Sequence, residues 1–478
     1  MSQPHVVIAG GGLAGLAAAV ALTRHGVRVT LLESRPRLGG RATSIIDKTT
    51  GEAIDNCQHV NMGCCVNFQR LCEWTDTRDW LRTEQQLQFI GRDGRINRFR
   101  NGPLPAPAHL AGSFARLSYL PFKDKLSLGR ALRAMLRTAP QEPRLFIDFL
   151  REQKQSQLLM DRFWNVVIVS ALSEDVTRVE YSYARQVFVQ GFLANRDGWK
   201  VQLLTRPLGE FYDHALARWL TDHGTEVRLR ASVREFECER DANNAVRISA
   251  AKLADQTAVT GDAWLCAVPF DRVSNVLPDP LKSAPLLSRA DEIEAAAITS
   301  VHLWYDRPIT ELRHAVLVDR LSQWMFNRTA ILETNSMPGR YAYQIVISNS
   351  APLRIKPDGQ TPMNQEELVT AVRREIEEIW PKAKSAELLH SRAITEHRAV
   401  FSVIPGIDEL RPPQRTSIPN FYLAGDWTRT GWPATMEGAV RSGFLAAEAI
   451  LEDAGITVKE PLLAPELPMS PLVRWMGG

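Results

Sequence analysis

Cysteine is scarce in this sequence, with only six residues among 478. They form no Cys-x-x-Cys pair, so a disulfide framework is not indicated and a reducing compartment is expected. The first four are poorly spaced for a zinc site, and we expect small, buried, inert thiols and no metal ion. The six are Cys57, Cys64, Cys65, Cys72, Cys238 and Cys266.

Long apolar runs are almost as rare. Residues 6–22 carry no charge, but no Lys or Arg precedes them, no cleavage-like site follows, and three consecutive glycines would weaken a membrane helix at its middle. No other stretch approaches ~20 apolar residues. We therefore expect neither a signal peptide nor a spanning helix, and we predict a cytoplasmic protein, soluble or peripherally attached at the inner face of the membrane.

Net charge is also small. A value of +3 gives no case for nucleic-acid binding. Apolar and charged fractions of 45% and 23% are those of an ordinary globular protein, which argues against disorder. A chain of this length exceeds one simple core, so two domains are expected.

What the sequence does contain is a strand–helix–strand unit at its start. Residues 6–9 form a β-branched run that ends at glycine, residues 13–25 have helical spacing and are rich in alanine, and residues 27–33 form the next strand. Residues 421–451 again indicate strand, loop and helix. The pattern predicts one discontinuous domain with a second domain inserted into it.

The first strand and helix enclose a glycine-rich loop. Gly10, Gly12 and Gly15 form G-x-G-x-x-G, in which the glycines serve the tight turn, the approach of backbone to a diphosphate, and helix–strand packing. Glu33 ends the second strand, at the distance expected of an acid that binds ribose hydroxyls. Together they predict a dinucleotide site at the helix N-terminus.

Two more stretches are suited to the same cofactor. Gly40 lets the backbone pass close to it, while Arg41 neutralises phosphate. Residues 423–443 read LAGDWTRTGWPATMEGAVRSG. Asp426 follows Gly425 at the end of a strand and is suited to bind a polyol chain.

These motifs together resemble the FAD-dependent amine oxidase/phytoene desaturase superfamily, and the resemblance spans the chain. It implies FAD as cofactor, with the Gly-Asp pair on its ribityl chain. The last helix, which Thr435 and Met436 open, would point its N-terminus at the electron-rich flavin ring. Val233 would contact the adenine through its backbone.

The related amine oxidases offer a contrast. They usually frame the flavin with an aromatic pair and often attach it through a cysteine. The aligned position here is Thr435, and no cysteine occurs between residues 267 and 478. The resemblance therefore implies noncovalent FAD and a substrate other than an amine.

Within the superfamily, residues 55–59, 396–401 and 425–443 look like hydroxysqualene dehydroxylase, also called squalene-associated FAD-dependent desaturase. This implies reductive dehydroxylation of hydroxysqualene to squalene, in squalene and hopanoid biosynthesis. The family has glycine where this chain has Cys57, which would be strained if that glycine needs a special backbone angle. The alternatives are a carotenoid (phytoene-type) desaturase and a non-catalytic prenyl-binding protein of the Rab-escort type, which would lack the flavin-facing motif.

The resemblance also implies an α/β fold, with a discontinuous Rossmann-type FAD-binding domain and an inserted mixed α+β substrate domain. The expected FAD-binding segments are 1–75, 201–275 and 386–460; the expected substrate-domain segments are 76–200, mostly helical, and 276–385; and a C-terminal arm covers 461–478.

Asp55, Gln58 and His59 stand among apolar neighbours, and buried polar groups need partners. We expect them to face the reacting end of an apolar isoprenoid beside the flavin. His59 would donate the proton, Asp55 would orient it or stabilise the developing cation, and Gln58 would hold the hydroxyl or a flavin edge. The alternative is that they bond only backbone or flavin and shape the loop.

A basic amphipathic stretch spans residues 109–137. It either contacts an anionic membrane, from which a long isoprenoid is collected, or forms the solvated face of an ordinary helix pair. Its cations, against the single acid Asp124, are Arg116, Lys123, Lys125, Arg130, Arg133 and Arg137. The aromatic residues expected either in an apolar tunnel or in the core are Trp164, Phe188, Phe192, Trp199 and Trp304.

Overall fold

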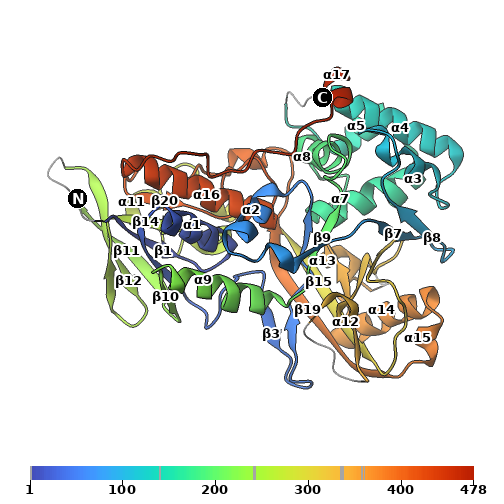
Figure 1. Cartoon of the computed structure of the whole chain (residues 1–478), viewed down its shortest axis with the longest axis horizontal. Helices are drawn as coiled ribbons and strands as arrows, with labels where there is room; N and C mark the ends of the chain where they lie inside the picture. Colours follow the sequence, from blue (N-terminus) through green and yellow to red (C-terminus); the bar gives the residue numbers. More distant parts are fainter. Residues whose placement is uncertain are drawn as a thin grey trace.

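The computed structural model describes residues 3–138, 142–240, 244–333, 339–356, 359 and 361–477. Figure 1 shows two halves side by side. The half at the N-terminal end is built on a parallel sheet, and the other on a larger mixed sheet and a group of helices. The predicted α/β fold, with a Rossmann-like sheet and a mixed sheet in the substrate domain, is confirmed.

The parallel sheet comes from three distant parts of the chain. Its central strand and the helix that follows are almost completely buried, so the charge-free opening of the sequence forms a protein core. In spatial order the strands are β10 (Glu226–Leu229), β2 (Arg28–Glu33), β1 (His5–Ala9), β14 (Ala263–Cys266) and β20 (Phe421–Leu423).

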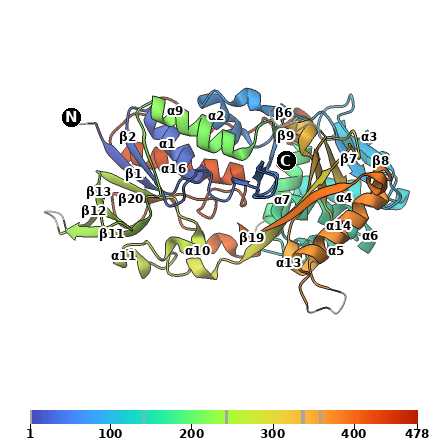
Figure 2. The same ribbon diagram turned by 90° about the horizontal axis from the view of Figure 1, so that it is seen from below.

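Helices cover one side of this sheet and a small antiparallel sheet lies on the other, as Figure 2 shows. The helices are α1 (Leu13–Arg24), α9 (Ala217–Asp222), which continues a π-helical stretch at Glu210–Leu216, and α16 (Met436–Asp453). The small sheet consists of β11 (Val233–Arg240), β12 (Val246–Leu253) and β13 (Ala258–Thr260), and is followed by α10 (Phe270–Val273) and α11 (Asp279–Lys282).

The second half contains a mixed sheet of seven strands. Their spatial order is β19 (Leu388–Phe401), β15 (Ala295–Tyr305), β18 (Tyr341–Ile347), β17 (Trp324–Asn327), β16 (His314–Leu317), β7 (Leu87–Ile90) and β8 (Ile96–Phe99). The helices of this region are α12 (Arg328–Ile331), α13 (Ser350–Leu353), α14 (Gln365–Ile379) and α15 (Lys382–Ser385).

Strand β19 corrects one expected boundary. We assigned residues 386–460 to the FAD-binding domain, but β19 pairs antiparallel with β15 along most of its length. Residues 388–401 therefore belong to the mixed sheet, and the chain returns to the parallel sheet after them.

The helices predicted within residues 76–200 are present. They are α3 (Ala111–Ala115), α4 (Phe122–Arg137), α5 (Phe146–Glu152), α6 (Gln157–Leu159), α7 (Asn165–Leu172) and α8 (Tyr181–Gln186), with π-helical stretches at Met160–Trp164 and Val187–Leu193. The remaining elements are the hairpin β3 (Ser44–Ile46) and β4 (Ala53–Asp55), the sheet of β5 (Val60–Met62), β9 (Val201–Leu204) and β6 (Leu81–Thr83), and the helices α2 (Val66–Trp74) and α17 (Pro471–Trp475).

Candidate active site

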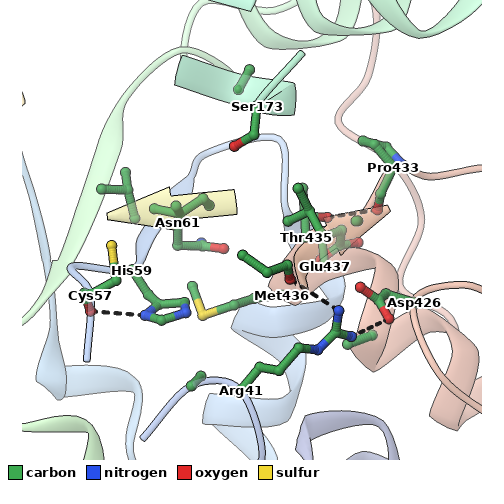
Figure 3. Close-up of a pocket in the computed structure, with 18 of the residues that line it drawn as sticks. Arg41, Cys57, His59, Asn61, Ser173, Asp426, Pro433, Thr435, Met436 and Glu437 are labelled. Carbon is green, nitrogen blue, oxygen red and sulfur yellow. Dashed lines mark hydrogen bonds and ion pairs between the residues drawn. The ribbon is translucent and has the colours of Figure 1, made fainter. Parts of the chain in front are cut away.

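A cavity of about 510 Å³ runs from the glycine-rich loop into the second half of the molecule. Its first part is lined by residues that follow β1, β2 and β20, at the carboxyl edge where ligands bind in open α/β sheets. Its second part is lined by α7, the π-helical stretch Val187–Leu193 and strands of the mixed sheet. Figure 3 shows the junction of the two parts.

The three glycines of the loop are required for different reasons. A Cβ on Gly15 would lie 2.0 Å from the Gly10 carbonyl oxygen, and Gly10 itself has a φ of +116°. A Cβ on Gly12 would meet no protein atom closer than 3.9 Å, at the Cα of Gly40. Gly12 and Gly40 both line the cavity, so the space in front of Gly12 is open to a diphosphate, as the motif predicts.

Glu33 lines the cavity at the end of β2 and is buried. The Gly11 N–H donates to one carboxylate oxygen at 2.7 Å, and the Arg35 N–H donates to the other at 2.7 Å. These bonds fix a carboxylate beside the glycine loop, which fits the ribose of a dinucleotide.

Val233 begins β11 and is not among the residues that line this cavity. Two residues before it, the Ala231 N–H donates to the Glu33 backbone oxygen at 2.8 Å. The segment expected at the adenine therefore runs directly beside Glu33.

Arg41 and Asp426 meet at the cavity wall, with Nη2 and Oδ1 2.5 Å apart (Figure 3). Arg41 also donates from Nη1 to the Ala399 carbonyl at 3.0 Å. Gly425 has a φ of +142°, and its N–H donates to Ser442 Oγ at 2.9 Å. The two motifs, which are 385 positions apart, thus form one polar site, where a guanidinium and a carboxylate suit a phosphate and a polyol.

The N-terminus of α16 faces the cavity. Thr435 is its N-cap, accepting from the Gly438 N–H at 3.0 Å, and Met436 lines the wall. Figure 3 places both residues opposite His59 and Asn61. A helix N-terminus carries partial positive charge and can stabilise negative charge on a bound ring.

Glu437 was not among the predicted site residues. Its carboxylate accepts from the backbone N–H groups of Asn67 at 3.0 Å and Phe68 at 2.9 Å, and so caps α2. It is fully buried, and burial raises its pKa. The sequence signal available for Glu437 was its position directly after the two residues that open α16.

The polar loop at 55–59 divides into two parts. Asp55 is buried and absent from the cavity wall. It accepts from Arg328 Nη2 at 2.5 Å, from the Leu208 N–H at 2.9 Å and from Ser44 Oγ at 2.7 Å. Gln58 lines the cavity but also accepts from Arg328. Asp55 thus anchors the loop from behind, and no local pattern in the sequence pointed to its partner Arg328.

His59 lines the cavity near Met436 (Figure 3). Its Nδ1 lies 3.0 Å from the Cys57 carbonyl oxygen. A carbonyl only accepts, so Nδ1 carries the proton and Nε2 is left as an acceptor in the neutral ring. Burial lowers the pKa of His59, which favours this neutral form.

Cys57 occupies the position where the resembling family has glycine. It is not among the non-glycine residues with positive φ, so the backbone strain considered above is absent. Its thiol lines the cavity, and burial raises its pKa to about 12. The thiol is therefore protonated and inert at neutral pH.

The far part of the cavity has apolar walls. Phe192 and Trp199 contribute to them, whereas Trp164 and Trp304 donate to Gln155 and Glu52 elsewhere. Phe188 lines a separate small space. Further aromatic residues that line the cavity are Phe89, Trp324, Phe326, Trp427 and Trp432.

All six cysteines are free. Cys65, Cys72 and Cys266 are buried as expected, whereas Cys57 and Cys64 are half-buried and Cys238 is exposed on β11, so the expectation of buried thiols is wrong for Cys238 and only partly met at Cys57 and Cys64. Among the described residues, no group of three or more His, Cys, Asp or Glu side chains is arranged to hold a metal ion. No helix in the described ranges is long and apolar enough to cross a membrane.

Curated proteins similar to this chain include phytoene and zeta-carotene desaturases. A 15-cis-phytoene desaturase of Synechococcus elongatus is 27% identical over 93% of this chain and 95% of its own length. A probable zeta-carotene desaturase of the same organism is 27% identical over 94% of this chain and 98% of its own.

Solved structures share the fold at lower identity. An oxidoreductase from Methanosarcina mazei superposes with a TM-score of 0.69 at 15% identity, covering 94% of this chain and 100% of its own. Cyclohexylamine oxidase from Brevibacterium oxydans gives 0.67 at 17%, covering 95% and 100%. The model of the family described as flavin containing amine oxidoreductase matches residues 13–451. The chain therefore belongs to the flavin containing amine oxidoreductase family and is an FAD-dependent oxidoreductase.

Proposed function

We propose that this flavoenzyme acts on a long apolar isoprenoid and removes the hydroxyl group of hydroxysqualene to give squalene. The observation that carries the proposal is the continuity of the cavity. A cradle with the features of a dinucleotide site opens, at the N-terminus of α16, into a space with apolar and aromatic walls. Such walls suit a hydrocarbon chain.

The dinucleotide part of the cavity would hold FAD without a covalent bond. When bound and reduced, FAD supplies the hydride for the reaction. Glu33 would bind the ribose, Arg41 and Asp426 the phosphate and ribityl groups, and Val233 the adenine through its backbone. The other residues assigned to the cofactor are Gly10, Gly12, Gly15, Gly40, Gly425, Thr435 and Met436.

His59 is the proposed proton donor to the substrate hydroxyl. Protonation lets the hydroxyl leave as water, and because the carbinol is allylic, the positive charge left on carbon is delocalised. Transfer of a hydride to that carbon completes the exchange of hydroxyl for hydrogen. Gln58, in the same wall, would hold the hydroxyl, and the apolar walls would exclude water that could recapture the cation.

Asp55 would act indirectly in this scheme. Its ion pair with Arg328, which also donates to Gln58, fixes the loop that carries His59. We therefore propose that Asp55 stabilises the fold of this loop, in place of the expected role beside the substrate hydroxyl.

A carotenoid desaturase is the second candidate, favoured by the names of the two Synechococcus relatives. Desaturation would remove a hydride from a similar apolar substrate, the reverse direction of transfer. The third reading, a non-catalytic prenyl-binding protein, is weakened by the complete flavin motifs and the family match.

One experiment separates the two enzymatic candidates. The protein reduced under anaerobic conditions is incubated with hydroxysqualene, the oxidised protein is incubated with phytoene, and the lipids are analysed. Squalene from the first incubation supports the proposal. Desaturated carotenes from the second, with hydroxysqualene unchanged in the first, would overturn it in favour of the desaturase.

A further inference from the structure

Helix α4 presents an unusual outer face. Phe122 and Leu126 are 76% and 56% exposed, although large apolar side chains are normally covered. The same helical stripe continues with exposed Arg130, Arg133 and Arg137. Asp124 is buried on the opposite side and accepts from Ser156, so the exposed stripe carries no acid.

Two neighbouring elements extend this face. Strand β8 exposes Arg98, and Arg100 directly follows the strand, while Ile96 is 48% exposed. Helix α3 contacts both β8 and α4, and the exposed Arg116 follows it. Figures 1 and 2 both place α3, α4 and β8 at the end of the molecule away from the N-terminus. We call this surface the α3–α4–β8 face.

The cations of this face lack carboxylate partners among the residues that the structure describes. Elsewhere, arginines commonly form ion pairs, as Arg313 does with Glu84. In the described part of the chain, no ion pair involves any of the seven exposed cations here. They are Arg98, Arg100, Arg116, Lys123, Arg130, Arg133 and Arg137.

The inner sides of the same three elements lead toward the active site. Phe99 from β8, Phe114 from α3 and Leu132 from α4 line a second apolar space of about 10 Å³. Phe89, Val167 and Phe192 line both this space and the main cavity, so these three side chains form the partition between them.

We propose that the α3–α4–β8 face docks on an anionic lipid bilayer and that isoprenoid substrate enters the cavity through this end. The substrate part rests on the proposed function. Unpaired cations match the headgroups of anionic lipids, and Phe122 and Leu126 supply apolar surface that can enter the interface. The second space has room for about one water molecule, so the partition of Phe89, Val167 and Phe192 must move aside when a substrate dissolved in the bilayer enters.

Vesicle sedimentation of the FAD-loaded protein tests the docking. The probe is a vesicle of equal parts phosphatidylglycerol and phosphatidylcholine, compared with pure phosphatidylcholine. Changing Arg130, Arg133 and Arg137 together to Gln should weaken binding to the anionic vesicles about a hundredfold, given about a fivefold loss for each cation near the surface. The matched control changes three exposed arginines elsewhere to Gln, with the same loss of charge: Arg218, Arg234 and Arg429.

The control should bind nearly as well as the wild type. Equal binding by the wild type and both variants would overturn the proposal, because the cations of this face would then not be needed for binding. Equal loss of binding in both variants would also overturn it, because net charge alone would then explain the binding. A separate variant, Phe122→Ser with Leu126→Ser, should reduce the binding that remains at ~1 M salt, where the Debye length is about 3 Å. Unchanged binding there excludes insertion of the two side chains.

Turnover distinguishes this proposal from the proposed function. Hydroxysqualene is offered either in anionic vesicles or in neutral detergent micelles. The Arg130/Arg133/Arg137 variant should be slow on vesicles and match wild type in micelles. Failure of every protein in both formats counts against hydroxysqualene as substrate and leaves the vesicle-binding result standing.

Discussion

His59 determines how the proposed dehydroxylation should depend on pH. The acid is the protonated imidazole, and burial lowers the pKa of His59 from its ordinary value of 6.5. At neutral pH the neutral form predominates, so the reactive form increases as pH falls through the lowered pKa.

We therefore predict that single-turnover oxidation of the reduced flavin by hydroxysqualene accelerates as pH falls below about 6.5. His59→Gln should abolish this pH dependence and, at low pH, reduce the rate about a hundredfold or more. Stopped-flow absorbance of the flavin follows both proteins. Identical pH profiles in the wild type and the variant would remove His59 from the proton transfer.

Asp55 should matter for stability more than for chemistry. Asp55→Asn leaves the Arg328 guanidinium buried without its counter-charge, and breaking a buried pair costs about 3–5 kcal/mol. The thermal midpoint should fall by several degrees, while the rate per FAD-loaded molecule stays within a few-fold of wild type. Asp279→Asn is the control, since its pair with Lys282 is exposed to solvent and contributes little to stability. A large loss of rate in a fully stable Asp55→Asn protein would restore a direct catalytic role.

At the residue scale, the sequence located residues that line the dinucleotide part of the cavity better than it described the polar loop at 55–59. Glu33 and Asp426 follow strands within short motifs, so their positions depend on local structure. The partner of Asp55 is 273 positions away, and pairing across that distance depends on how the two halves pack. Asp55 and His59 are also close in sequence, yet His59 lines the cavity and Asp55 lies behind its wall.

At the scale of elements, we predict that two similar substitutions near the start of α1 differ in their effect on the stability of the apoprotein. Gly15→Ala places a Cβ 2.0 Å from the Gly10 carbonyl and should destabilise the protein even without cofactor. Gly12→Ala has no protein atom within 3.9 Å of its Cβ, so the apoprotein should keep its thermal midpoint. In both variants FAD affinity should fall, in Gly12→Ala because the methyl group occupies the space of the diphosphate. Wild-type FAD affinity of Gly12→Ala in a titration would place the diphosphate elsewhere.

Elements with local signals were predicted well, and those defined by distant pairing were not. The strand–helix–strand opening is present as β1, α1 and β2, and the strand and helix expected within residues 421–451 are present as β20 and α16. Strand β19 was assigned to the wrong half because its partner β15 lies about ninety residues earlier. A strand's own sequence records burial and propensity but does not identify the sheet that it joins.

At the scale of the whole molecule, the cavity connects parts of the chain that the sequence separates. Residues from the two ends of the chain and from both sheets line it. A ligand that binds only this assembled state must stabilise the folded protein as a whole.

FAD should therefore raise the thermal midpoint in a concentration-dependent way. Free FAD at 100 times its dissociation constant should add about 2.7 kcal/mol of stability. Because no cysteine follows Cys266 and the half-buried Cys57 thiol in the cavity wall is protonated at neutral pH, acid or heat should release yellow FAD into the supernatant. Absorbance of the supernatant and of the pellet, together with melting curves at several FAD concentrations, measures both effects. Flavin that remains with the precipitated polypeptide would show a covalent link, and a midpoint that is insensitive to added FAD would place the cofactor outside this cavity.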